Sequence, residues 1–297
     1  MLNPVYSHHI TSKKNNGRPQ VLNMTQKVAL IPYLYIYIFL YQNMCRTLKA
    51  NAATVNEKAP LGEVLKETIS ANVSEDSVVL EFAQRDGYIT QVIDFKQELE
   101  ILKVIVLGEE ELGQNAYQVM CFVTRFLRGD FISADAMSKL RQKNPGTVRT
   151  PEEDRGTEDF DLDLSVDVTT ASSLSSHIPR LCGEASTATY ASDRDLKLWT
   201  QQRTDIDTDW SSISEVTNHL PTRGVARCSD GGRDLNSSCA CRYQACIAWY
   251  PCGLKYCKGK DKDSGKNVSY RCGIRTCRKC RNFSYFVSQR QLCLWDE

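Results

Sequence analysis

Hydrophobic segments with a strand-like composition dominate the first half of the chain. Residues 78–82 and 88–95 are rich in β-branched and aromatic side chains, and an Asp-Gly pair between them is a strong hairpin signal. The segments 100–107 and 116–127 have a similar composition and contain no proline, which favours buried strands. These four segments predict a β-sheet.

Other segments in the same half favour helices. Residues 134–143 contain no β-branched side chain, Ser133 can cap the first turn, and an Asn-Pro-Gly sequence ends the helix. A second helix is expected over residues 181–190, and residues 194–200 continue or follow it. The first half of the chain is therefore expected to be α+β.

A strand with one acidic face is expected between these helices. A charged loop covers residues 147–159, and apolar and polar positions then alternate strictly from residue 160 to residue 168. Asp161, Asp163 and Asp167 share the polar face. We interpret them as a solvated strand face, and a calcium site or an acid/base pair is the alternative.

Asp94 ends an apolar strand and lies on the same face as Val92. A carboxylate at such a position can simply lie at the rim of the sheet. If it is buried instead, the loss of hydration raises its pKa, because burial disfavours the charged form. Asp94 is therefore a candidate pH-sensitive carboxylate.

The N-terminal region has the layout of a secretory leader. The apolar run over residues 28–41 follows a lysine and is shorter than the roughly 20 residues that a bilayer span needs. We therefore expect a leader over residues 1–52, with Met24 as a candidate start and no stable membrane span. Cleavage is expected near Cys45 or at residues 50–52, and an uncleaved signal anchor is the alternative.

The composition changes sharply near residue 228. The whole chain has a net charge of +1, but residues 228–297 contain 13 Lys/Arg and 6 Asp/Glu, which gives 13 − 6 = +7. Ten of the 13 cysteines also lie there, and the preceding segment is polar. We therefore predict an α+β domain over residues 53–200, a polar linker over residues 201–227 and a cysteine-rich domain over residues 228–297.

Disulfides explain the cysteines better than a metal does. If Cys45 leaves with the leader, 13 − 1 = 12 remain, an even number as full oxidation requires. Cys277 and Cys280 have the spacing of half a zinc knuckle, but no second such pair and no later histidine completes a site. We expect no metal and no cofactor, and leave the pairing open. The expected disulfide cysteines are Cys121, Cys182, Cys228, Cys239, Cys241, Cys246, Cys252, Cys257, Cys272, Cys277, Cys280 and Cys293.

The cysteine-rich segment also combines cations with aromatic side chains. In a nuclear protein this would favour nucleic acid, but outside the cell the polyanions are sulfated glycans and anionic lipid surfaces. We therefore expect no nucleic-acid partner, and a solvated basic face without a fixed partner is the alternative. The candidate polyanion-binding residues are Lys255, Lys258, Lys260, Arg275, Arg278, Lys279 and Arg281. Candidate glycosylation sites, each in an N-x-S/T sequence, are Asn72, Asn236, Asn267 and Asn282.

The sequence contains no enzyme signature among the motifs that can be recognised. G-x-S-x-G, H-E-x-x-H, P-loop and G-x-G-x-x-G sequences are all absent. A full set of disulfides would also leave no thiol nucleophile. We therefore expect no catalytic residue and no enzymatic activity.

Several segments resemble the Out at first family of secreted proteins, and the resemblance runs from about Glu63 to Glu297. The resembling segments include residues 107–109, 119–124, 136–145, 248–257, 272–277 and 289–297. The family has no established enzymatic activity and takes its name from a developmental context. The resemblance therefore implies a secreted, extracellular protein without catalysis.

The first half of that family is in turn similar to BRICHOS domains, which act as chaperones against β-aggregation. Their pattern of one Asp and two Cys is matched here by Asp94, Cys121 and Cys182. The resemblance implies a BRICHOS-like mixed β-sheet with two helices and a Cys121–Cys182 disulfide, followed by a small disulfide-rich C-terminal domain. Typical BRICHOS precursors differ by carrying a membrane span and a separate aggregation-prone segment.

Three hypotheses for the function follow. The first is a secreted developmental ligand or matrix-associated factor that binds an unknown extracellular protein or receptor, with sulfated glycans as further candidate partners. The second is a BRICHOS-type extracellular chaperone that caps aggregation-prone strands by edge pairing. The third is an intracellular zinc-binding protein, which predicts free thiols and bound metal.

Overall fold

The computed structural model describes residues 51–58, 64–84, 87–140, 146–202, 213–222, 224–230, 234–260, 265–293 and 295–296. Almost all of the expected leader, including Cys45, lies outside these ranges. Residues Ala50–Glu297 form one compact unit. Its described part is mixed α+β and consists mostly of strands, which confirms the expected fold class at that level.

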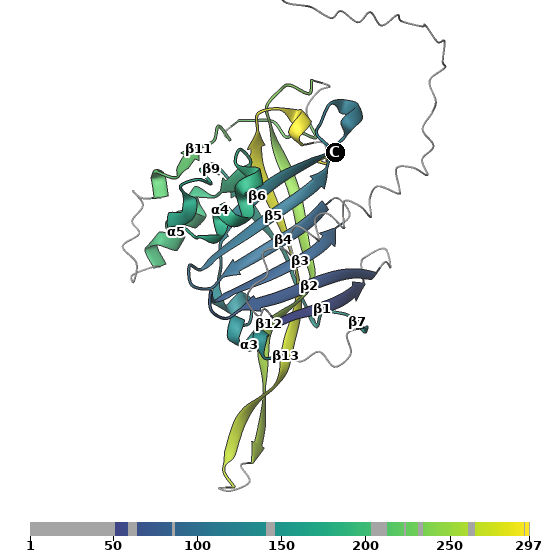
Figure 1. The fold of residues 1–297 in the computed structure, drawn as a ribbon, viewed down its shortest axis with the longest axis vertical. Coiled ribbons are helices and arrows are strands. Elements are labelled where there is room, and N and C mark those ends of the chain that lie inside the picture. Colours follow the sequence, from purple (N-terminus) through teal and green to yellow (C-terminus); the bar gives the residue numbers. More distant parts are fainter. Residues whose placement is uncertain are drawn as a thin grey trace, which may run out of the picture. The chain divides into compact units, whose positions relative to one another are not determined.

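The larger sheet contains ten strands in the order β11-β9-β10-β6-β5-β4-β3-β2-β1-β7 (Figure 1). Its centre is an antiparallel meander from β1 to β6, and parallel pairing of β6 with β10 and of β1 with β7 makes the sheet mixed. The four strands predicted from the hydrophobic segments are confirmed as β3 to β6. The ten strands are β1 (Asn51–Lys58), β2 (Val64–Asn72), β3 (Ser77–Gln84), β4 (Gly87–Asp94), β5 (Leu99–Leu107), β6 (Tyr117–Arg125), β7 (Val148–Arg149), β9 (Leu164–Val166), β10 (Thr189–Ala191) and β11 (Thr217–His219).

The smaller sheet has the order β12-β13-β8 and consists of β12 (Cys239–Lys260), β13 (Asn267–Val287) and β8 (Glu153–Leu162). Strand β8 runs parallel to β13, so the predicted loop over residues 147–159 is wrong for most of its length. Its carboxylates lie beside the cations of the tail, which neutralise them. The strand predicted over residues 160–168 is divided, because β8 ends at Leu162 and β9 continues in the larger sheet.

The described helices are short. They are α3 (Ala134–Ser138), α4 (His177–Cys182) and α5 (Asp193–Gln202), with 3₁₀ turns η1 (Glu110–Leu112), η2 (Arg128–Asp130), η3 (Ala171–Ser173), η4 (Gly183–Ala185) and η5 (Arg290–Leu292). Ser133 caps α3 as expected, since its Oγ accepts a hydrogen bond from the Ala136 N–H. The helix stops earlier than predicted, at Ser138. None of the helices in the described ranges has the length and apolarity needed to cross a membrane.

The helix predicted over residues 181–190 is confirmed only at its start. The helix α4 begins at His177 and ends at Cys182, the 3₁₀ turn η4 covers Gly183–Ala185, and Thr189–Ala191 forms β10 beside Cys121–Val123 of β6. Thr189 and Tyr190 favour an extended backbone, and this neighbouring strand supplies the hydrogen bonds that a strand requires.

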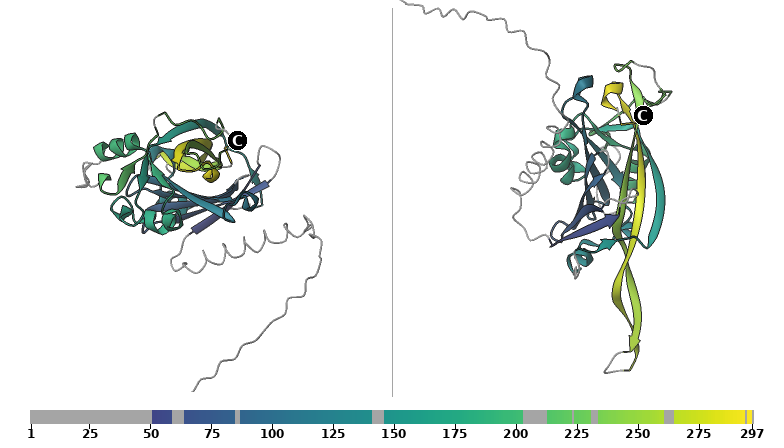
Figure 2. Two further views of the ribbon diagram at one scale, coloured as in Figure 1. Left: turned by 90° about the horizontal axis from the view of Figure 1, so that it is seen from above. Right: turned by 90° about the vertical axis from the view of Figure 1, so that its right-hand side faces the viewer.

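Strands β4 to β6 of the larger sheet are covered on both faces. One face packs against the β12–β13 hairpin, where the rings of Phe122 and Phe283 stack with centroids 4.4 Å apart. The other face of these strands packs against α4 and α5, and residues of β9 and β10 at one end of the same sheet belong to that second buried cluster (Figure 2). The two predicted domains therefore share one core. Part of the predicted linker is also structured, because Thr217–His219 forms β11, while residues 203–212 lie outside the described residues.

Candidate functional site

Twelve cysteines form six disulfides. Cys121 in β6 bonds to Cys182 in α4 and thereby ties a strand to a helix, as the resemblance implies. The other five bonds lie within residues 228–293; they are Cys228–Cys239, Cys241–Cys293, Cys246–Cys280, Cys252–Cys277 and Cys257–Cys272. Cys277 and Cys280 thus belong to two different disulfides in this structure, and not to one shared metal site.

Asp94 is buried, with 3% of its surface exposed, so it does not lie at the rim of the sheet. Its Oδ2 accepts a hydrogen bond from the Ser175 Oγ at 2.6 Å, and its Oδ1 accepts one from the Gln97 N–H at 2.9 Å. The His177 Nε2 lies 4.0 Å from Oδ2. Asp94 therefore holds the end of β4 to the segment that leads into α4, and its role as a pH-sensitive carboxylate stays a prediction.

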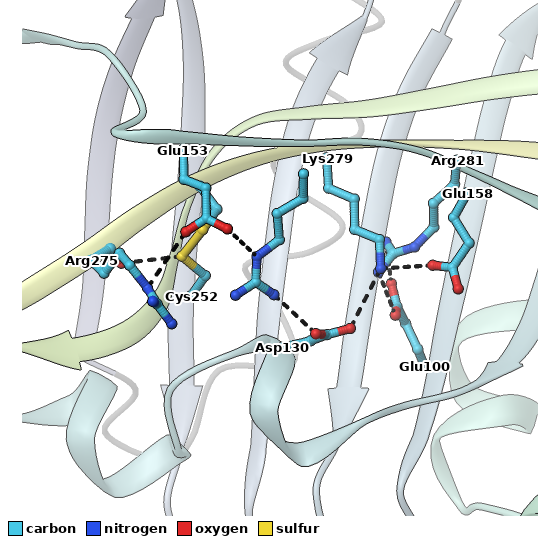
Figure 3. A network of polar contacts seen from close by, with 10 residues as sticks. Glu100, Asp130, Glu153, Glu158, Cys252, Arg275, Lys279 and Arg281 are labelled. Carbon is cyan, nitrogen blue, oxygen red and sulfur yellow. Dashed lines mark hydrogen bonds and ion pairs between the residues drawn. A yellow bond between two sulfur atoms is a disulfide. The ribbon is translucent and has the colours of Figure 1, made fainter.

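A buried ion pair joins the two sheets. Glu100 in β5 and Arg281 in β13 form a bidentate contact, with N–O distances of 2.6 and 2.8 Å and side-chain exposures of 5% and 8% (Figure 3). Gln91 also donates its amide N–H to Glu100. Burial raises the pKa of Glu100, and the adjacent Arg281 charge lowers it by a smaller amount. The tail thus contributes a cation to the core of the larger sheet.

Further ion pairs extend from this buried pair along β8 (Figure 3). The Lys279 Nζ lies 2.7 Å from a carboxylate oxygen of Glu158 and 3.4 Å from one of Asp130. Asp130 also contacts Arg155 at 2.9 Å, and Arg155 lies 3.6 Å from Glu153. Acidic and basic groups alternate along this row, so the acidic β8 neutralises the base of the basic hairpin.

Most of the predicted polyanion-binding residues are engaged in this neutralisation. Arg281 and Lys279 lie between the sheets, with side-chain exposures of 8% and 12%. The remaining engaged cations contact residues 152–154; the pairs are Lys255–Glu152, Arg275–Glu153 and Arg278–Asp154. Lys258 and Lys260 are exposed and have no ion-pair partner within the described ranges.

These two lysines lie on an arm, which we define as residues 254–260 and 265–274 of the β12–β13 hairpin. The arm continues beyond the part of β13 that pairs with β8 (Figure 1). Cys257 and Cys272 connect its two strands. Tyr256 and Tyr270 are 60% and 53% exposed, so the arm presents aromatic side chains to solvent.

The register of the arm separates its two faces. Tyr256 lies opposite Arg271, Lys258 opposite Ser269 and Lys260 opposite Asn267. Opposed residues and residues two apart share a face, so the two lysines, Arg271 and Tyr256 form one cationic face. Arg271 was missed as a candidate, although the alternation of a strand could have grouped it with Lys258.

The opposite face of the arm is uncharged along its outer part, beyond Lys255. It carries Cys257, Gly259, Val268 and Tyr270. A Cβ at Gly259 would lie only 3.0 Å from the Tyr270 ring, so the glycine leaves room for this ring to lie across the hairpin. Beyond Lys255, the paired strands of the arm therefore carry their charged residues on one face and uncharged residues on the other.

The four glycosylation sequons differ in their surroundings. Asn236 and Asn267 are exposed, and the Asn72 Oδ1 caps a turn by accepting the Ser74 N–H at 3.2 Å. The Asn282 side chain is engaged on both sides, because its Nδ2 donates to Asp159 and its Oδ1 accepts from Gln244, each at 2.8 Å. Both polar atoms of the Asn282 amide are therefore engaged in the folded protein, and glycosylation at this residue stays a prediction.

Comparisons with known proteins agree with these two regions of the chain. A family model described as "Out at first" matches residues 51–199, and one described as "Out at first, C-terminal" matches residues 227–297. An "Out at first protein" of Drosophila virilis is 48% identical over 252 residues, which cover 82% of this chain and 81% of the relative.

A second relative, the "Out at first protein" of Drosophila melanogaster, is 48% identical over 253 residues. The match covers 82% of this chain but 51% of that relative, so the chain spans about half of its length. No solved structure is significantly similar to the chain.

Proposed function

The chain belongs to the Out at first family, and from this premise we propose that it is a secreted, non-enzymatic protein that binds its partner through the arm. Six disulfides are compatible with an oxidising, extracellular environment. The proposed role is that of a developmental ligand or matrix-associated factor.

The cationic face of the arm is the observation that carries this proposal. The cations at the base of the hairpin are neutralised by residues 152–159, whereas Lys258, Lys260 and Arg271 have no ion-pair partner within the described ranges. Charges that are not neutralised internally can attract an oppositely charged partner and accelerate its association. Sulfated glycans are the extracellular polyanions that fit this face.

Retention on heparin tests the proposal. The variant K258Q/K260Q/R271Q should elute from a heparin column at clearly lower salt than the wild type. The control variant K66Q/K139Q/K197Q removes the same charge from exposed residues outside the arm and should elute with the wild type. Equal shifts of the two variants, or elution of the wild type at or below about 0.15 M salt, would refute the arm as a polyanion site.

Strand capping of the BRICHOS type is a second candidate function, and an incompletely paired edge of β6 supports it. Because the two sheets share a core, the test uses the whole secreted chain. The expected result is a substoichiometric delay of amyloid formation, and no delay at equimolar concentration would refute strand capping.

A further inference from the structure

Strand β6 is fully paired on one side and only partly paired on the other. Strand β5 pairs with β6 along all of Tyr117–Arg125. On the opposite side, β10 pairs only with Cys121–Val123, and the Arg125 N–H donates a hydrogen bond to the Asp195 carboxylate. The first half of β6 therefore has an edge that no strand covers within the described residues.

One hydrogen bond shows which residues of β6 direct their backbone groups toward this edge. The Cys121 N–H donates to the Ala188 carbonyl at 2.9 Å, so the odd-numbered residues of β6 direct their backbone groups away from β5. Tyr117 and Val119 have the same parity. Over the ranges that the structure describes, their backbone groups have no hydrogen-bond partner in the protein.

A cavity of about 770 Å³ lies along this edge, within the usual size range of ligand sites. Residues of β6 and β10 and the end of β13 line it; the apolar and aromatic ones include Val119, Met120, Tyr190, Tyr285, Leu292 and Trp295. Tyr117 and Leu292 at its mouth are 45% and 41% exposed. The cavity thus combines an open strand edge with an aromatic floor.

The charge of the cavity restricts its occupant. Among the described residues that line the cavity, Glu184 is the one charged residue, and it already pairs with Lys103. Burial raises the pKa of Tyr190 to about 12, so this phenol stays neutral at physiological pH. Its described lining contains no cation to hold a polyanion, and a neutral apolar occupant matches it.

We propose that this cleft binds an extended, uncharged peptide segment of a partner protein. The segment adds to the larger sheet as a strand, with its backbone paired to Tyr117 and Val119. Its alternate side chains then enter the cavity beside Tyr190 and Tyr285, because side chains of a strand point to opposite faces. The site deepens the strand-capping proposal and is independent of the arm.

The test uses the secreted full chain and a fluorescent peptide of about eight alternating Val and Thr residues, the length of an ordinary strand. A second peptide carries an N-methyl group on every residue, which removes its backbone N–H donors along both edges and leaves the side chains. We expect the N-methylated peptide to bind about tenfold more weakly, the loss expected for one or two backbone hydrogen bonds. Equal binding of the two peptides, or no binding of either, would overturn the edge site.

A matched pair of variants locates the binding. V119P removes an N–H that the β5 ladder does not use, a change that an edge strand tolerates, whereas V119T keeps this N–H. V119P should weaken binding of the parent peptide several-fold, and V119T should leave it unchanged. Heparin retention and the disulfide map report whether V119P is folded. If V119P is not folded, the comparison of the two peptides on the wild-type protein alone decides whether the edge binds a strand.

The outcomes also separate this site from the function on which it rests. Peptide binding without any delay of amyloid formation would support the site and refute strand capping. A delay that is unchanged in folded V119P would support strand capping and refute this edge as its site. Binding of an apolar dye that the peptide fails to displace would assign the cavity to small molecules and overturn the proposal.

Discussion

Replacing Arg281 by methionine should destabilise the protein by about 3–5 kcal/mol, the usual cost of leaving one partner of a buried ion pair without the other. Arg281 and Glu100 are 8% and 5% exposed and lie in different sheets. The substitution leaves the Glu100 carboxylate between these sheets without its bidentate partner. E100Q leaves the guanidinium in the same position and should cost a similar amount.

The double variant E100Q/R281M should recover most of this loss. Two charges about 4 Å apart attract each other by roughly 4 kcal/mol at an effective dielectric constant of about 20. Desolvation costs several kcal/mol for each ion, so the intact pair contributes little net stability. The amide oxygen introduced by E100Q would still accept the hydrogen bond from Gln91, so the double variant leaves no buried charge at this position and should lie within about 2 kcal/mol of the wild type.

Urea unfolding of the oxidised protein measures these differences, provided that the slope of free energy against urea stays constant. R278M is the matched control on the same strand, because its partner Asp154 is 54% exposed, and it should leave the unfolding free energy almost unchanged. A loss below about 1 kcal/mol in R281M, or strict additivity of the single losses in the double variant, would refute the reasoning.

Three further predictions concern the surface. Replacing Cys257 and Cys272 by serine should lower heparin retention and leave the main calorimetric transition in place, because neither residue belongs to the core. Hydrogen bonds from the Gly156 N–H and the Arg278 side chain lower the pKa of Asp154, and those from Asn282 and Arg242 lower the pKa of Asp159. The ionised Asp154 and Asp159 therefore stabilise the folded protein above their unfolded pKa of about 3.9, and this stabilisation is lost as the pH falls through their lower folded pKa values. Because D154N/D159N lacks these carboxylates, its urea midpoint should decrease less than that of the wild type between about pH 5 and pH 2. Glycopeptide mapping should find the sequons at Asn72, Asn236 and Asn267 occupied and Asn282 unmodified.

The strands β3 to β6 could be predicted because local composition decides them. Their β-branched and aromatic residues favour strands over helices, and the turns from β3 to β5 are short. The segment 181–190 could not be assigned in this way. Its short strand depends on a neighbour, β6, that lies more than 60 residues away in the sequence, as the separation of 61 between Cys121 and Cys182 illustrates.

The sequence of the β12–β13 hairpin contains a strand-like alternation that its many cysteines obscured. Alternate residues from Cys239 to Ile247 are buried, and those between them are exposed or half-buried, which is the period of a strand. Irregular cysteine spacing instead favoured an irregular disulfide scaffold. The sequence could not show which basic residues are exposed either, because the buried Arg281 and the exposed Lys258 lie in segments of the same basic composition.

The charge asymmetry of the chain has a structural explanation in β8. This acidic strand belongs to the region matched by the first family model, but it pairs with β13 in the region matched by the second. Without β8, the base of the hairpin would keep a row of uncompensated cations and an open edge. Without the hairpin, Phe122 and Glu100 of the larger sheet would lose the aromatic and ionic partners that bury them. The two regions are therefore expected to fold together, and Lys258, Lys260 and Arg271 are cations of the arm that have no ion-pair partner within the described residues.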